Sequence, residues 1–146
     1  MKHIGITGTR FKMTGPQGRK LSRLLLAQYE PESALHHGAC VGVDEYTATK
    51  ASYLGYWVVA HLPIDDKWLS TQSIRVSNEV CKAKEYIDRN HDIVEASSVV
   101  IAVPNTKEEV LRSGTWSTIR YAKKLGKEIH IIFPSGETEV FEDTKV

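Results

Sequence analysis

The sequence predicts an α/β fold in which a five-stranded, mainly parallel sheet carries helices on both faces. Short apolar segments rich in β-branched residues alternate along the chain with longer segments of helical periodicity. The segments with strand character are 2–8, 33–38, 56–62, 97–104 and 128–134. Their nearly continuous apolar character is typical of parallel strands that are buried on both faces.

The helical segments begin and end at residues that commonly bound helices. Thr14 and Gln17, with Pro16 between them, match a capping box at the start of the first helix. Gly55 is placed to end the second helix. Three further helices are predicted over residues 43–54, 88–96 and 115–125. Asp88 is the predicted N-cap of the second of these, and Ser113 or Gly114 that of the third.

Two segments depart from this alternation. Residues 62–87 are long, polar and without an obvious strand, so we expect an excursion over the sheet edge of the kind that often forms lids or binding segments. Residues 137–146 are acidic, and we expect a flexible tail there. The ligand-binding domain is therefore expected to cover residues 1–136.

Composition narrows the function classes. The chain has 146 residues, 41% hydrophobic and 25% charged, which fits one globular domain. Its net charge of +1 lacks the basic excess of a general nucleic-acid binder, so we do not expect nucleic acid as a partner. No apolar stretch suits a membrane span or signal peptide, and the two cysteines form no CxxC pair. We expect a cytoplasmic protein without a disulfide framework.

Turns that follow the predicted strands have the composition of anion-binding loops. In the first turn, Gly8 permits close approach of a ligand, Thr9 offers a hydroxyl, and Arg10 can pair with phosphate bidentately. The turn over 37–44 ends at Asp44, which could cap the following helix or bind ribose hydroxyls. A helix cap is the simpler interpretation of that residue.

A third turn, residues 113–115, directs backbone amides from a helix start toward a possible anion. If the strands at 2–8 and 97–104 are neighbours, this turn faces the first turn across the crevice at the sheet's switch point. His36, His37 and Cys40 resemble part of a metal cluster, but a fourth ligand is missing. We therefore interpret these three as buried structural side chains and expect neither a metal nor a cofactor.

Four segments together resemble a known group of proteins. GITGTR, HHGACVGVDEYTATKASYLG, DRNHDIVEASSVVIAVP and SGTWSTIRYAKKLGKEIHIIFPSG follow the order and character of the SLOG superfamily. These are the Rossmann-like domains shared by DNA-processing protein A and the Lonely Guy cytokinin-activating phosphoribohydrolases. The resemblance covers Ile4 to about Gly136 and is strongest to the DNA-processing branch. It implies a single Rossmann-like domain with a ligand crevice, and an assembly of identical subunits.

The chain departs from the Lonely Guy pattern at one functional position. Those enzymes hydrolyse the N-glycosidic bond of nucleoside monophosphates with a Pro-Gly-Gly-x-Gly-Thr turn, a Glu shortly after it and an upstream Arg. Here Arg89 can stand for that Arg, but no Glu follows Gly114-Thr115. Glycosidic cleavage needs a carboxylate near the sugar. The nearby substitutes are Asp44, Glu108 and Glu109, although the last two are simpler to interpret as a solvated loop face. Asp44, Arg89 and Glu109 are the candidate catalytic residues.

Three hypotheses about function follow. The first is a protein that binds a nucleotide or nucleotide-derived signal, for sensing or sequestration. The second is an N-glycosidase that releases base from a nucleoside 5′-monophosphate, and the third is a binder of single-stranded DNA. For the first hypothesis, the ligand-contacting residues we expect are Gly8, Thr9, Arg10, Gly38, Gly42, Asp44, Arg89, Asn90, Pro104, Ser113, Gly114 and Thr115.

Overall fold

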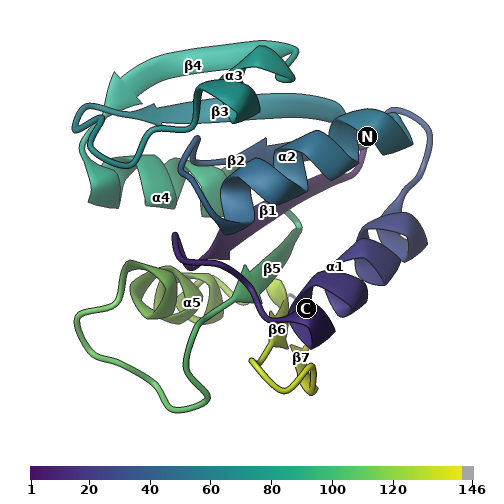
Figure 1. The fold of residues 1–146 in the computed structure, drawn as a ribbon, viewed down its shortest axis with the longest axis vertical. Coiled ribbons are helices and arrows are strands. Elements are labelled where there is room, and N and C mark those ends of the chain that lie inside the picture. Colours follow the sequence, from purple (N-terminus) through teal and green to yellow (C-terminus); the bar gives the residue numbers. More distant parts are fainter. Residues whose placement is uncertain (143–146) are drawn as a thin grey trace.

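A computed structural model describes residues 1–142 as one sheet with helices on both faces. The strands are β1 (His3–Gly8), β2 (Ala34–His37), β3 (Trp57–Pro63), β4 (Glu79–Lys84), β5 (Val99–Val103), β6 (Glu128–Ile132) and β7 (Thr138–Phe141). From top to bottom of Figure 1, their order in the sheet is β4-β3-β2-β1-β5-β6-β7. All neighbouring pairs are parallel except β6 and β7. The predicted α/β class and mainly parallel sheet are confirmed, and two strands are added to the five expected.

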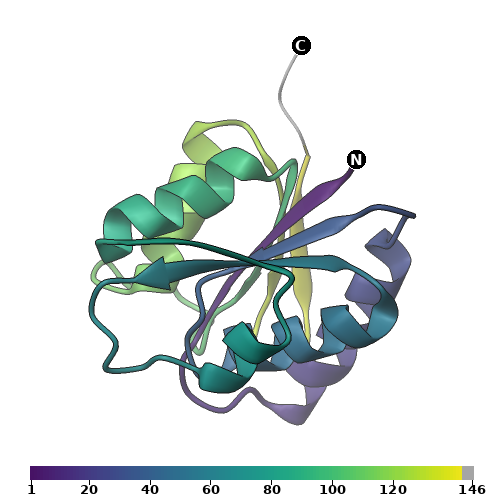
Figure 2. The ribbon, with the colours of Figure 1, turned by 90° about the horizontal axis from the view of Figure 1, so that it is seen from above.

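Helices form a layer on each side of this sheet, as Figure 2 shows from above. The helices are α1 (Gly15–Gln28), α2 (Val43–Leu54), α3 (Thr71–Arg75), α4 (Tyr86–Ala96) and α5 (Gly114–Lys124). One apolar core joins α1 and α2 to the sheet, and the other joins α4 and α5 to it. Within residues 1–142, no helix combines the length and the apolar character that crossing a membrane requires.

Strand β1 lies at the centre of the parallel sheet, as the sequence predicts. It pairs with β2 on one side and with β5 on the other, and five of its residues are in register with Val99–Val103. The chain therefore winds outward in opposite directions from β1. In such a sheet, the carboxyl ends of the strands beside this switch point frame a crevice.

The excursion over 62–87 was expected to lack a strand, and that expectation is wrong. It contains the short helix α3 and the edge strand β4, which extends the sheet beyond β3. Most β4 residues are exposed, so the strand has none of the apolar periodicity by which a buried strand is recognised. Its position is fixed instead by backbone pairing with β3.

The expected tail also needs correction over part of its length. Residues Thr138–Phe141 form β7, which pairs antiparallel with β6 after a turn closed by a hydrogen bond from Gly136 N to Phe133 O. This short edge strand has mostly exposed residues, so its sequence resembles that of a loop although its backbone is paired. Residues 143–146 of the expected tail lie outside the described part of the chain.

The capping box at the start of α1 is present, and it contains a buried glutamine that reaches across the sheet. Thr14 Oγ1 accepts from Gln17 N, and Gln17 Oε1 accepts from Thr14 N. Gln17 Nε2 donates to Pro104 O and Ile132 O, at 2.7 and 3.1 Å. One side chain therefore caps the helix and satisfies carbonyls at the ends of β5 and β6.

Replacing this glutamine should destabilise the fold. Gln17→Met keeps the volume but leaves the buried carbonyls of Pro104 and Ile132 without a donor, at about 1–3 kcal/mol for each. We expect a loss of roughly 2–4 kcal/mol in the free energy of unfolding, measured by urea denaturation. Gln28→Met, at the other end of α1, is the matched control. Equal stability of the two variants would contradict this role.

Candidate functional site

A cavity of about 460 Å³ opens at the carboxyl end of β1, between the turn after β2 and the first turns of α4 and α5. The pairing of β1 with β5 brings the turn at 8–10 opposite the turn at 113–115, as the sequence predicts. Predicted ligand-contacting residues that line this cavity are Gly8, Thr9, Arg10, Gly38, Asp44, Arg89, Asn90, Ser113, Gly114 and Thr115.

Asp44 lies in the first turn of α2, and its carboxylate folds back onto the turn that precedes the helix. Its Oδ2 accepts from Gly38 N at 3.2 Å and from Cys40 N at 3.3 Å. It gives α2 no side-chain cap, since the N-cap residue is Gly42. Burial raises the pKa of Asp44 to about 6, although Arg89 and the two amides lower it. The carboxyl group can therefore gain or lose a proton near neutral pH.

Arg89 is the buried cation of the site, with only 6% of its surface exposed. Its Nη1 donates to the carbonyl of Gly38 and, at 3.4 Å, to that of His61, and its Nε donates to Asn90 Oδ1 at 2.7 Å. A Cβ on residue 38 would overlap this guanidinium and approach Asp44 Oδ2 to 3.0 Å. Glycine at this position therefore lets both charged groups lie against the turn.

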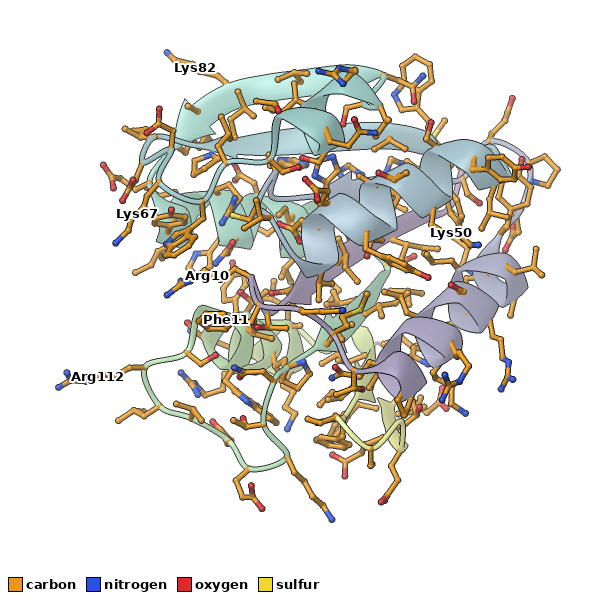
Figure 3. The ribbon with its side chains drawn as sticks, viewed as in Figure 1. Arg10, Phe11, Lys50, Lys67, Lys82 and Arg112 are labelled. Atoms are coloured by element: carbon orange, nitrogen blue, oxygen red, sulfur yellow. The ribbon has the colours of Figure 1, made fainter. Side chains whose placement is uncertain are left out.

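Two further arginines border the cavity in different ways. The guanidinium of Arg10 lies 4.6 Å from the ring centroid of Trp68 and 5.5 Å from that of Phe11. In Figure 3 the Arg112 side chain extends outward, away from its loop. This residue therefore lines the cavity with atoms close to its backbone and not with its guanidinium. Of these two residues, only Arg10 is held against other cavity-lining side chains.

The helix α5 begins at the cavity as predicted, with Ser113 as its N-cap. Ser113 Oγ accepts from Trp116 N, which leaves the amides of Gly114 and Thr115 at the start of the helix. Such amides favour a negative charge. Thr9 serves a local turn instead, because its Oγ1 accepts from Phe11 N.

Three of the expected site residues lie elsewhere. Glu109 forms an ion pair with Arg120 at 2.7 Å on the surface, and it does not line the cavity. The carbonyl of Pro104 accepts from Gln17. Gly42 lines a separate hollow between α1 and α2. Its φ is +89°, and a Cβ at this position would lie 2.5 Å from Thr9 O, so only glycine fits there. The sequence placed all three near the turns but could not show their orientation.

Three aromatic side chains and one cysteine complete the cavity wall, and their place in it was not predicted from the sequence. They are Phe11, Cys40, Trp68 and Tyr86. Trp68 and Tyr86 come from the excursion and the helix that follows it, so the unusual length of that segment was the available signal. Burial raises the pKa of the Cys40 thiol. Trp116 is buried in the α5 core, where its Nε1 donates to Thr106 Oγ1, and it does not line the cavity.

The histidines next to the β2 turn have structural partners. His36 bonds to His3 and His61 at 2.8 Å each, and His37 bonds to Ser77 Oγ at 2.8 Å. Burial lowers the pKa of His36 and of His37 to about 3. Among residues 1–142, no group of three or more His, Cys, Asp or Glu side chains is arranged to hold a metal ion.

Comparison with solved structures identifies the fold. A molybdenum cofactor binding protein from the phototrophic bacterium Rippkaea orientalis matches with a TM-score of 0.67 at 22% identity, covering 90% of this chain and 76% of that one. DNA processing protein A from Streptococcus pneumoniae matches with a TM-score of 0.66 at 17% identity, over 90% of this chain and 50% of that one. The chain therefore shares the α/β fold of these two proteins over nine tenths of its length.

A third structure, the structural-genomics protein TM1055, matches with a TM-score of 0.60 at 21% identity, over 88% of this chain and 72% of that one. No family model and no curated protein sequence matches the chain. At these identities the likeness concerns the fold alone, and the chemistry of the cavity depends on the residues that line it.

The pKa of Asp44 predicts how stability depends on pH. The pKa of Asp44 is about 6 in the folded protein and near 3.8 in an unfolded chain, so the folded protein binds this proton more tightly. The contribution of Asp44 to stability therefore falls as the pH rises through this range. Asp44→Asn abolishes that titration. Its free energy of unfolding, relative to wild type, should therefore rise by roughly 2–3 kcal/mol between about pH 4 and pH 7.

Urea denaturation of both proteins over this pH range measures the difference, in which the histidine titrations common to both cancel. Asp66→Asn, at an exposed loop position, reports the effect of removing a surface charge alone. A difference between Asp44→Asn and wild type that does not change with pH would refute the raised pKa.

Proposed function

We propose that this protein binds a nucleotide or a nucleotide-derived ligand in the cavity at the carboxyl end of β1. The observation that carries the proposal is the pairing of two arginines with a helix N-terminus around one cavity. Arg10 and Arg89 supply positive charge, and the amides of Gly114 and Thr115 face the same space. A phosphate group matches both features, because it accepts bidentate hydrogen bonds from arginine and from helix-terminal amides.

Asp44 supports a sugar-bearing ligand. It is the buried carboxylate of the cavity, and the ion pairs of residues 1–142 do not include it. An unpaired buried carboxylate gains from hydroxyl donors, which the vicinal diol of a ribose provides. The volume of about 460 Å³ is in the range of small-molecule sites. The aromatic part of the wall suits a planar base.

A second candidate function is cleavage of an N-glycosidic bond. Its support is the pKa of about 6 at Asp44, since an acid–base group near the working pH is the effective kind. Glu109 is a weaker candidate because it is paired with Arg120 outside the cavity. Arg89 would orient the phosphate in this scheme. The missing Glu after Gly114-Thr115 makes binding without turnover the better supported function.

Loss of Arg10 should weaken nucleotide binding strongly. A panel of nucleoside mono-, di- and triphosphates should include at least one that raises the melting temperature of the wild type. Arg10→Ala should raise the Kd for that nucleotide by roughly tenfold to a hundredfold, because a charge-assisted hydrogen bond contributes about 1.5–3 kcal/mol. Calorimetry measures both proteins. Lys12→Ala, an exposed neighbour outside this cavity, is the control and should bind like wild type.

Release of free base separates the two candidate functions. If the protein only binds, nucleoside monophosphates incubated with micromolar protein should remain intact by chromatography, while Asp44→Asn binds them more weakly. If it cleaves them, Asp44→Asn should lower turnover by roughly a hundredfold or more and leave binding largely intact. Base release that Asp44→Asn abolishes would therefore replace binding by hydrolysis as the function. A salt-dependent shift with single-stranded DNA would instead support a nucleic-acid ligand.

A further inference from the structure

The side chain of Arg10 is held at the cavity without any hydrogen bond. Among residues 1–142 it takes part in no hydrogen bond or ion pair, and its recorded contacts are with aromatic ring faces. Arg89, in contrast, donates from Nη1 to two carbonyls and from Nε to Asn90 Oδ1. The N–H edges of Arg10 are therefore all available to a ligand.

Ring faces hold a guanidinium in a way that suits this task. A cation–π contact attracts the face of the planar group, so it restricts the side chain without consuming the in-plane N–H donors. Trp68 is the nearer of the two rings, with its centroid 4.6 Å from Arg10 Cζ, and Phe11 lies at 5.5 Å. Restricting a long side chain before binding reduces the entropy that binding would otherwise cost.

The loop that carries Trp68 is tied firmly to the site. Trp68 O accepts from Val41 N at 2.9 Å, and Ser70 N donates to Ala39 O at 2.8 Å. The Ser70 hydroxyl also donates to Glu45 Oε1 of α2 at 2.6 Å. The backbone at Trp68 is thus anchored to the turn that carries Cys40 and leads to Asp44, although its loop belongs to the excursion.

We propose that Trp68 is a positioning residue that holds Arg10, with its N–H edges free, as a preformed ligand for the anionic group of the bound molecule. The inference rests on the proposed function, because Arg10 is the anion ligand there. It assigns to the excursion a part in setting affinity, and it makes Trp68 act through Arg10. A direct stack of Trp68 on a planar base is the rival role.

A double-mutant cycle with inorganic pyrophosphate distinguishes these roles, because this probe has a phosphate charge and no base. Calorimetry would compare wild type, Trp68→Leu, Arg10→Ala and the double variant, with AMP as the second probe. We expect Trp68→Leu to weaken pyrophosphate binding by about two- to fivefold, the range of an exposed cation–π contact. In the Arg10→Ala background the same substitution should have no further effect.

Three matched variants show whether the effect belongs to this contact. Trp68→Phe keeps a ring face and should retain most of the affinity. Trp57→Leu removes a half-exposed tryptophan that does not line the cavity, and it should bind like wild type. Lys67→Ala removes the other cation over the Trp68 ring, at 5.3 Å, and should also leave binding unchanged.

A measurement without ligand tests the geometry independently. The Trp68 ring current should shift the δ-proton NMR resonances of Arg10 upfield, and Trp68→Leu should abolish the shift while Trp57→Leu retains it. Absence of the shift in wild type would overturn the inference. So would AMP binding that Trp68→Leu weakens equally with and without Arg10.

Failure of the proposed function gives a different result. If wild type binds neither pyrophosphate nor any nucleotide while the Arg10 resonances remain shifted, the ligand role of Arg10 is refuted together with the proposed function. In that case the packing of Arg10 on Trp68 would stand as a structural contact only.

Discussion

The parallel pairing of β1 with both β2 and β5 is the constraint on which the site depends. Because the two halves of the chain wind away from β1 in opposite directions, the turns at the ends of these strands are left facing one another. The cavity at that edge of the sheet is framed by turns and by the starts of helices. A change in strand order would separate Arg10 from Ser113 and remove the cavity altogether.

Around this crevice, the fold places opposite charges against one glycine turn. Asp44 binds the amides of the turn, while Arg89 binds its carbonyl at Gly38 and the carbonyl of His61. Both side chains are thus held by backbone groups of the turn, and among the described residues no ion pair joins them. Burial is the larger influence on Asp44, which is why its pKa rises despite the nearby cation.

Arg89 and Arg10 are held at the cavity in different ways. Arg89 is buried and fixed by hydrogen bonds, so it contributes mainly a steady positive potential. Arg10 is exposed and rests on ring faces, so its donors remain free. A site built from both has a fixed positive field and a set of free hydrogen-bond donors, and this combination suits the phosphorylated ligand that we propose.

The sequence by itself determined the strand and helix alternation, the capping box at Thr14, and the glycine and hydroxyl turns, because each depends on local periodicity or on residues close in the chain. It missed β4 and β7, whose mostly exposed residues show no apolar pattern and whose positions are fixed by backbone pairing with β3 and β6. Only the tertiary structure decided that Glu109 pairs with Arg120 outside the cavity and that Trp68 lies on Arg10. Trp68 is far from Arg10 in the chain, and Glu109 lies in the loop before the helix that carries Arg120, so residue spacing does not show which way these side chains point.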